Sequence, residues 1–270
     1  MASPSDIRLV VFDWAGTTID FGCRAPAGAF VAAFADRGVS VSLPEARRPM
    51  GLHKKDHLRV MLQDADLASR WEKTTGSAWA ETDVEALYKV VTPLQVAAAK
   101  QYAELIPQVT ACVAKLRSRD VRIAATTGYF REAAEVVAAA GKAQGYEPDA
   151  TICADDVPAG RPAPWMIFRM MESLGVYPTS SVVKVGDTVV DIKDGKNAGV
   201  WSVGVVDSSN EVGLSLEEFQ ALNEEDREAL RLGVRSKFFA AGADAVIQDL
   251  SELPGLVNEF NRRLRTGRRP

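Results

Sequence analysis

The sequence predicts an α/β protein with a doubly wound parallel sheet and a block of helices inserted after the first strand. Residues 9–12 are apolar at every position, as in a strand that is buried on both faces. From residue 107 onward, short apolar runs alternate with segments of helical periodicity, which is typical of βα units. Residues 22–103 show helical spacing and no convincing strand. Together these observations predict one sheet and one helical insertion.

The elements before residue 107 are one strand and a series of helices. The strand at 9–12 ends at Asp13, and small, turn-forming residues follow it. A break is expected at Pro93, because proline lacks the N–H that a helix interior needs. The helices predicted in this part of the chain are 25–38, 53–62, 67–73 and 84–105.

The elements after residue 107 alternate between helix and strand. The predicted strands are 121–125, 150–153, 182–185, 201–206 and 245–247. The predicted helices are 109–117, 131–140, 163–174, 191–198, 216–239 and 250–263. We therefore predict a discontinuous core domain of residues 1–21 and 104–270, with a helical domain of residues 22–103. The chain would cross between them twice, and paired crossings can act as hinges that close a cleft.

Composition and charge exclude several classes of function. The chain has 270 residues with ordinary apolar and charged fractions, and its net charge of −4 gives no reason to expect nucleic acid as a partner. No stretch is long and apolar enough to span a membrane, and the N-terminus has no apolar signal core. The three cysteines show no metal-type spacing, and reduced thiols are expected. A cytoplasmic protein without a membrane partner is the expectation.

Two predicted strands end in a carboxylate. Asp13 follows the first strand, and Asp187 follows the strand at 182–185 after a glycine. A lone aspartate at a strand end most often caps a turn. Two such tips at one sheet edge can converge on a hard cation, because Mg²⁺ prefers oxygen ligands. The pair therefore predicts a magnesium site.

The segment Asp13-Trp14-Ala15-Gly16-Thr17-Thr18 resembles the nucleophile motif of the haloacid dehalogenase (HAD) superfamily of phosphoryl-transfer enzymes. Most phosphatases of that superfamily have a second aspartate at the position of Ala15, where it serves as general acid and base. Alanine there, together with Met50-Gly51-Leu52-His53-Lys54, is similar to the phosphonatase (phosphonoacetaldehyde hydrolase) family. The resemblance covers about residues 7–215, with the motifs in the expected order. It implies a HAD-like core and a helical cap.

The resemblance implies roles for the residues at the strand tips. Asp13 would be the nucleophile toward phosphorus, forming an aspartyl-phosphate. Mg²⁺ would be held by Asp13, the backbone carbonyl of Ala15 and Asp187. Asp191 would support this site, although a carboxylate in the first turn of a helix is favoured by the helix dipole in any case. Both interpretations of Asp191 stay open.

The phosphoryl group would be bound by residues from two further loops. Thr127 and the amide of Gly128 can donate hydrogen bonds to phosphoryl oxygens at the turn after the strand at 121–125. Arg161 stands where the superfamily has lysine or arginine, and its guanidinium can bind phosphoryl and carboxylate oxygens together. Tyr129 could line the pocket or be a packed aromatic side chain.

The cap would supply the group that Ala15 removes. Breaking a carbon–phosphorus bond leaves a carbanion, which an amine can stabilise by condensing with the substrate aldehyde to an iminium. The resemblance assigns this Schiff base to Lys54. His57 lies three residues later, on the same helical face, and could transfer protons or tune Lys54. Met50 and Cys23 match family pocket positions, with core packing as the alternative.

The expected function is therefore hydrolysis of phosphonoacetaldehyde to acetaldehyde and phosphate. The resemblance further implies a homodimer that acts in 2-aminoethylphosphonate degradation. One alternative is a HAD phosphatase or phosphomutase acting on a small phosphate ester, although Ala15 would leave it without the usual acid. A catalytically inactive protein that binds a phosphorylated metabolite is the other alternative, and it does not explain why Asp13, Thr127, Arg161 and Asp187 are all present.

Overall fold

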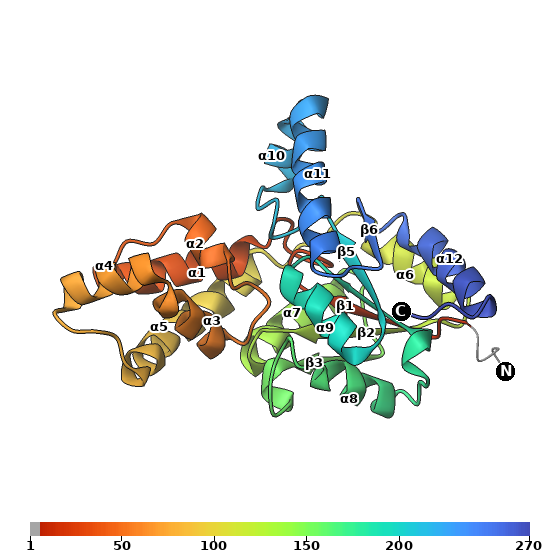
Figure 1. The fold of residues 1–270 in the computed structure, drawn as a ribbon, viewed down its shortest axis with the longest axis horizontal. Helices are drawn as coiled ribbons and strands as arrows, with labels where there is room; N and C mark the ends of the chain where they lie inside the picture. Colours follow the sequence, from red (N-terminus) through yellow and green to blue (C-terminus); the bar gives the residue numbers. More distant parts are fainter. Residues whose placement is uncertain (1–5) are drawn as a thin grey trace.

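The computed structural model describes residues 6–270 and contains one sheet of six strands in the order β3-β2-β1-β4-β5-β6 (Figure 1). Each pair of neighbouring strands is parallel. This confirms the predicted parallel α/β fold; residues 1–5 of the predicted core segment 1–21 lie outside the described residues. The strands are β1 (Leu9–Asp13), β2 (Arg122–Thr127), β3 (Ala150–Cys153), β4 (Val182–Gly186), β5 (Trp201–Val205) and β6 (Ala245–Ile247).

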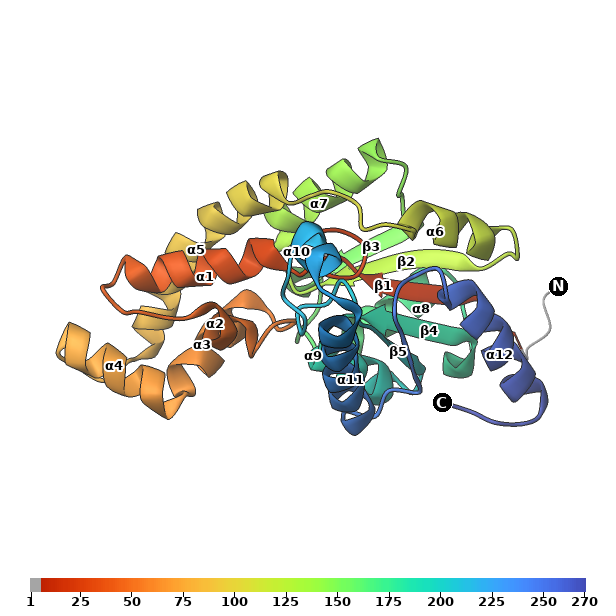
Figure 2. The ribbon, with the colours of Figure 1, turned by 90° about the horizontal axis from the view of Figure 1, so that it is seen from above.

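Alternate side chains of β1 pack into two different layers of helices. Val10 and Phe12 belong to a hydrophobic cluster with one set of helices, and Leu9 and Val11 belong to a cluster with the other set. This is the two-residue period of a strand covered on both faces (Figure 2). The first layer is α6 (Val109–Arg117), α7 (Arg131–Ala143) and α12 (Leu253–Arg265), and the second is α8 (Trp165–Ser173) and α9 (Val189–Ala198).

The direction of winding reverses at β1. From β1 the chain builds β2 and β3 on one side, and then returns to build β4, β5 and β6 on the other. In open α/β sheets ligands bind outside the carboxyl ends of the strands at such a switch point. The carboxyl ends of β1 and β4 therefore mark the expected site.

Five of the six helices between β1 and β2 form a separate group beside the sheet (Figures 1 and 2). They have a hydrophobic cluster of their own, which includes Phe30, Leu58, Trp71 and Leu87. This cluster supports the predicted division at residues 22–103, which we keep as a proposal about domains. The helices are α1 (Arg24–Ala35), α2 (Leu43–Arg47), α3 (Lys54–Gln63), α4 (Ala65–Thr75) and α5 (Glu81–Gln101).

Two details of the helical insertion differ from the sequence prediction. The helix α2 was not predicted, because it has only five residues; it begins at a capping box between Ser42 and Glu45. The predicted break at Pro93 is wrong, because α5 is continuous through it. Pro93 and Lys89, whose carbonyl loses its helical partner, are both exposed, so water can satisfy that carbonyl.

The segment predicted to be helical at 216–239 is helical, but it is divided. The structure has two helices, α10 (Leu216–Ala221) and α11 (Glu224–Ala240), separated at Leu222. Asn223 starts the second helix, because its side chain accepts a hydrogen bond from the N–H of Asp226 at 2.9 Å. The other predicted elements are present, with bounds that differ by a few residues. No helix in the described part of the chain could cross a membrane.

Candidate active site

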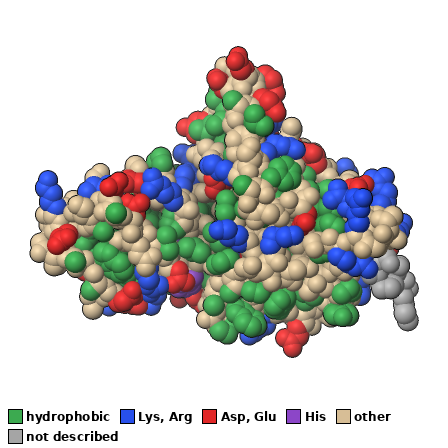
Figure 3. All heavy atoms as spheres, viewed as in Figure 1, with side chains coloured by type: hydrophobic (Ala, Val, Ile, Leu, Met, Phe, Trp, Pro, Cys, Tyr) green, Lys and Arg blue, Asp and Glu red, His purple; other side chains and the backbone are tan. Residues whose placement is uncertain are grey.

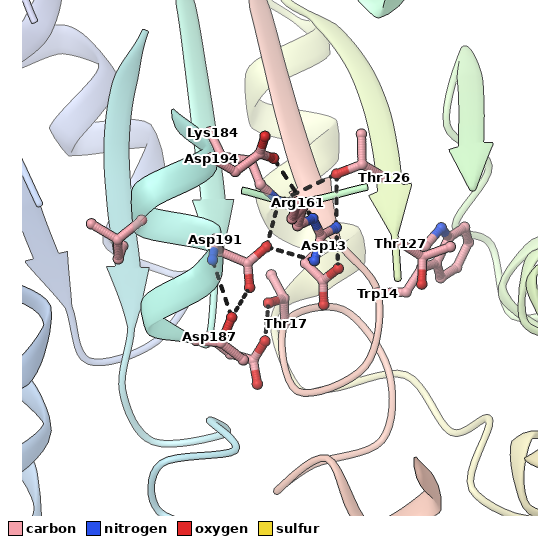
Figure 4. Close-up of polar contacts among 12 residues, drawn as sticks. Asp13, Trp14, Thr17, Thr126, Thr127, Arg161, Lys184, Asp187, Asp191 and Asp194 are labelled. Atoms are coloured by element: carbon pink, nitrogen blue, oxygen red, sulfur yellow. Dashed lines mark hydrogen bonds and ion pairs between the residues drawn. The ribbon is translucent and has the colours of Figure 1, made fainter. Parts of the chain in front are cut away.

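Three carboxylates meet at the switch point of the sheet (Figure 4). Asp13 is the last residue of β1, Asp187 directly follows β4, and Asp191 lies in the first turn of α9. All three are buried, and one oxygen of each lies within 4.8 Å of the others. The structure thus brings together the two strand tips that the sequence singled out, with Asp191 beside them.

The turn after β1 requires glycine at position 16. Gly16 has a φ of +82°, and a Cβ built on it would lie 2.1 Å from Oδ2 of Asp187. The Thr18 hydroxyl donates to the backbone carbonyl of Asp13 at 3.0 Å and fixes the start of the turn. Ala15 lines the same cavity as Asp13 and Asp187. The sequence Ala-Gly at this point therefore lets the two strand tips approach.

Arg161 reaches across the sheet edge to the carboxylates. Its side chain is buried, and Nη2 donates to Oδ1 of Asp13 at 2.6 Å and to the hydroxyl of Thr126 at 2.9 Å. Its Nη1 lies 2.8 Å from Oδ1 of Asp191. One guanidinium therefore holds two of the carboxylates, as bidentate arginine geometry allows.

Two residues that the sequence analysis missed complete this ion-pair network. Lys184 is fully buried in β4, and its Nζ lies 2.8 Å from Oδ1 of Asp191. Asp194, one turn further along α9, lies 3.6 Å from Nε of Arg161. A lysine inside an otherwise apolar strand was the available signal for the first, because a buried ammonium needs a partner. Asp194 gave no signal, since its contact depends on how α9 packs.

The electrostatics divide the carboxylates into two kinds. Burial raises the pKa of Asp13, against the opposing effect of Arg161. Burial and the neighbouring charges of Asp13 and Asp191 raise the pKa of Asp187 well above its usual range. Burial would also raise the pKa of Asp191, but the guanidinium and Lys184 outweigh it and lower that pKa. Asp191 is thus neutralised by protein cations, whereas Asp187 is not.

These donors fit a divalent metal ion. Carboxylate oxygens are the ligands that Mg²⁺ prefers, and a cation would relieve the repulsion that raises the pKa of Asp187. Asp187 is oriented by the backbone N–H of Asn210, which donates to its Oδ2 at 2.8 Å. The charge on Asp191 is already shared by Arg161 and Lys184, so it is better suited to support the site than to ligate.

Lys54 enters this cavity from the first turn of α3. Its side chain is buried, and its Nζ lies 5.0 Å from the ring centre of Tyr129 and 5.7 Å from that of Phe30. Burial lowers its pKa from 10.5 to about 8. Lys54, Met50 and Cys23 line one cavity with Asp13 and Arg161. The predicted amine therefore faces the predicted nucleophile.

His57 lies behind the amine. Its Nε2 donates to the carbonyl of Ala46 at 2.9 Å, and its ring stacks on Phe30 at 3.7 Å between centres. Burial and the nearby charge of Lys54 lower the pKa of His57 well below its usual value. The imidazole is therefore neutral and packs against the ring that contacts Lys54. Its role in proton transfer stays a prediction.

The turn after β2 borders the cavity on the other side. Thr127 and Tyr129 are buried, and the Thr127 hydroxyl accepts a hydrogen bond from the N–H of Tyr129 at 3.1 Å. A Cβ on Gly128 would lie 2.8 Å from the carbonyl of Gly51 in the helical insertion. Glycine at 128 thus allows the core and the insertion to touch beside the site. All three residues line the cavity.

Comparison with known proteins shows which family this chain resembles. A family model described as haloacid dehalogenase-like hydrolase matches residues 7–199. The chain is 43% identical to the phosphonoacetaldehyde hydrolase of Bacillus cytotoxicus over 256 residues, which are 95% of this chain and 97% of that protein. It is 40% identical to a phosphonoacetaldehyde hydrolase-like protein of Syntrophobacter fumaroxidans, over 98% of this chain and 95% of that protein.

A solved structure is similar over the whole chain. The crystal structure of a phosphonoacetaldehyde hydrolase like protein from Oleispira antarctica superposes with a TM-score of 0.97 at 38% sequence identity. The match covers 100% of this chain and 97% of that one, so both the sheet and the helical insertion are included.

Proposed function

The chain belongs to the haloacid dehalogenase-like hydrolases and to the phosphonoacetaldehyde hydrolase family within them, and we propose that it converts phosphonoacetaldehyde and water to acetaldehyde and phosphate. One observation carries the proposal: the buried amine of Lys54 lines the same cavity as the buried carboxylate of Asp13. An amine that can form an imine and a carboxylate that can take a phosphoryl group are the two nucleophiles that this reaction needs.

The proposed reaction begins at the aldehyde. The neutral amine of Lys54 attacks the carbonyl carbon, and loss of water with uptake of one proton leaves an iminium. Asp13 then attacks phosphorus, the carbon–phosphorus bond breaks, and its electron pair forms the double bond of an enamine. Protonation of the enamine on carbon and hydrolysis of the resulting iminium release acetaldehyde and the free amine. Water then cleaves the aspartyl-phosphate, which restores Asp13 and releases phosphate.

The surroundings of both nucleophiles support these steps. The lowered pKa of Lys54 keeps a useful fraction of the amine neutral near neutral pH. Arg161 contacts Oδ1 of Asp13, and it would bind a phosphoryl oxygen of the substrate beside that carboxylate. Thr127 and the Gly128 amide border the cavity and would donate to the remaining phosphoryl oxygens. His57 would accept a proton at Nδ1, the ring nitrogen that does not donate to Ala46.

Mg²⁺ would be held by Asp13, Asp187 and the backbone carbonyl of Ala15, with Asp191 in support. When bound, it supplies positive charge that favours the attack of a carboxylate on an anionic phosphoryl group. In the protein itself, Asn210 orients Asp187, and Lys184 and Arg161 hold Asp191. Asp187 is thus held by a neutral backbone donor, whereas Asp191 is held by two cationic side chains.

The main alternative is a phosphatase or phosphomutase acting on a small phosphate ester. Such an enzyme needs an acid to protonate the leaving alkoxide, and Ala15 cannot provide one. The cavity has instead a lysine with a lowered pKa, which ester hydrolysis does not need. The phosphonate reaction accounts for both features.

We place the activity in 2-aminoethylphosphonate degradation, in the cytoplasm, as part of a homodimer. The three cysteines are free, as expected in a reducing compartment. Trp165 and Phe168 on α8 are exposed and pack edge to face, and Tyr177, four residues after the end of α8, is 80% exposed. Hydrophobic side chains gather over α8 along the lower edge of Figure 3, and an exposed apolar patch of this kind suits contact with a second copy.

The experiment that tests the function is phosphate release from phosphonoacetaldehyde. The wild type should release phosphate, and Lys54→Arg should lose most of this activity, because a guanidinium does not form the imine. Lys55→Arg is the matched control, since Lys55 is partly exposed and pairs with Glu85. Borohydride added with substrate should reduce the imine and label Lys54 alone. Phosphate release without a label at Lys54 would argue against the imine route, and neither phosphate release nor a label would favour the ester enzyme.

A further inference from the structure

The active-site cavity is closed in this structure. Its volume is about 20 Å³, which is room for little more than one water molecule. Lys54 and Asp13 are 4% and 6% exposed. A substrate with an aldehyde and a phosphonate group therefore enters only when the helical insertion moves away from the core. Some contact must then hold the insertion in place once the substrate is inside.

The movement would occur at the two chain crossings between core and insertion. They lie side by side, because Ile19 pairs with Leu105 in an antiparallel bridge. The N–H of Asp20 donates to the carbonyl of Glu104 at 3.1 Å. Two paired chain segments of this kind permit rotation of the insertion as a unit. They do not themselves fix whether it is open or closed.

Arg47, at the end of α2, makes the contact that does. Its Nη1 donates to the carbonyls of Gly22 and Cys23 in the first crossing, at 2.7 Å and 3.2 Å. It also reaches the core loop after β5, where it donates to Oδ1 of Asn210 at 3.1 Å and to the carbonyl of Gly213 at 3.2 Å. One guanidinium thus joins the insertion, the crossing and the core.

The core loop is shaped to receive this side chain. Gly213 has a φ of +71°, and a Cβ there would lie 3.2 Å from both Cζ and Nε of Arg47. The side chain of Asn210 also donates back to the carbonyl of Arg47 at 3.3 Å. The contact is therefore reciprocal and involves side chain and backbone on both partners. A long, solvated arginine would need none of these features.

The same loop orients the carboxylate of Asp187. The backbone N–H of Asn210 donates to Oδ2 of Asp187, and the hydroxyl of Ser208 donates to the carbonyl of Gly16 at 2.7 Å. The residue that receives Arg47 is thus the residue that fixes Asp187. Asn210 therefore links the closed position of the insertion to the orientation of the Asp187 carboxylate.

We propose that Arg47 is a positioning residue: by bonding at once to the first crossing and to the loop that orients Asp187, it holds the helical insertion, with Lys54, closed over Asp13. The inference rests on the proposed function for its catalytic consequence, but its structural part does not. Opening separates Arg47 from Asn210 and Gly213. These hydrogen bonds to a charged donor therefore exist only in the closed state, and removing the guanidinium would destabilise that state and not the open one.

The test compares Arg47→Met with Arg48→Met. Arg48 is adjacent, exposed, and paired only within the insertion, with Asp64, so it controls for the loss of an arginine from this segment. The first measurement is the rate at which iodoacetamide alkylates Cys23, followed by peptide mass spectrometry. Cys23 lines the closed cavity. Cys112, buried in α6 of the core, is the internal standard for global unfolding.

Arg47→Met should raise the alkylation rate of Cys23 by about tenfold relative to Cys112, the size expected when bonds to a charged group are lost from one state. Arg48→Met should leave the rate unchanged. The direction is diagnostic, because burial and nearby carboxylates raise the pKa of Cys23 and Arg47 opposes them. Removing the guanidinium from a protein that stayed closed would therefore slow alkylation. A rate that is unchanged or slower overturns the proposal.

A second variant guards against a folding defect in Arg47→Met. Asn210→Ala removes the side-chain partner of Arg47 but keeps the backbone N–H that bonds to Asp187. It should also raise the alkylation of Cys23, with a smaller change because Arg47 keeps its bonds to Gly22, Cys23 and Gly213. Phosphate release should fall in both variants. A wild type that releases no phosphate from phosphonoacetaldehyde would refute the proposed function, while the alkylation rates would still decide the role of Arg47.

Discussion

The lowered pKa of Lys54 predicts how the reaction rate depends on pH. The perturbation is a change of pH from 6 to 9 with phosphonoacetaldehyde as substrate. In the proposed reaction only the neutral amine of Lys54 attacks the aldehyde, and burial lowers the pKa of Lys54 to about 8. With that pKa, roughly one lysine in ten is neutral at pH 7, against roughly one in 3,000 for an ordinary lysine. Burial therefore supplies roughly a 300-fold larger fraction of reactive amine.

The assay is kcat/KM for phosphate release, because this parameter reports ionisations of the free enzyme. It should rise about tenfold per pH unit below pH 7 and level off above pH 8. Lys55→Arg should give the same profile, because Lys55 pairs with Glu85 outside the cavity. A profile that is flat from pH 6 to 9, or one that keeps rising toward pH 10, would refute the reasoning.

A second group, Asp194, titrates in the same pH range, and its effect on the rate must be separated from that of Lys54. Burial raises the pKa of Asp194 from 3.8 to about 7, against the opposing charge of Arg161. Its ionisation could add to the slope of the rate below pH 8. Repeating the profile with Asp194→Asn removes that contribution, and the limb assigned to Lys54 should remain.

Three further outcomes follow from the geometry of the site. The first concerns the carboxyl of Asp194, whose pKa is raised from 3.8 to about 7 in the folded protein, so that between pH 4 and 7 the folded state binds a proton that the unfolded state has lost. The free energy of unfolding of the wild type, relative to Asp194→Asn, should therefore decline as the pH rises from 4 to 7, and urea unfolding at several pH values measures this. In Ala15→Asp, the new carboxylate should allow slow hydrolysis of p-nitrophenyl phosphate and should reduce cleavage of phosphonoacetaldehyde, because it raises the pKa of Lys54; equal phosphonate turnover would contradict this. In Gly16→Ala, the Cβ would meet Asp187 at 2.1 Å, so activity should fall by about 100-fold or more and the Mg²⁺ concentration for half-maximal activity should rise.

Much of the fold could be predicted because β1 obeys two rules at once. All its residues are apolar up to the tip, which indicates burial on both faces, and the alternation then assigns Val10 and Leu9 to opposite layers. Periodicity does not place the break between α10 and α11, because residues 223–228 that follow it are all polar and carry no apolar spacing of their own. Only the side chain of Asn223, which bonds to the N–H of Asp226, decides where the second helix starts.

The candidate site divides in the same way. Asp13, Asp187 and Thr127 stand at strand ends, so topology alone brings them to one edge of the sheet. Arg47 and Asn210 are 163 positions apart and lie outside any motif, and their contact exists only when the insertion rests on the core. Periodicity and spacing describe one element at a time. A contact between the core and the insertion therefore cannot be predicted from the pattern of either segment.

The buried charges explain why the site needs residues beyond its motifs. Asp13, Asp187 and Asp191 bring three buried carboxylates together, where unpaired ions are costly. Arg161 and Lys184 both contact Asp191, so Lys184 leaves the guanidinium free to hold Asp13 as well. The negative charge that remains lies near Asp187, the carboxylate whose pKa is most raised, and a divalent cation is the ligand that would stabilise it.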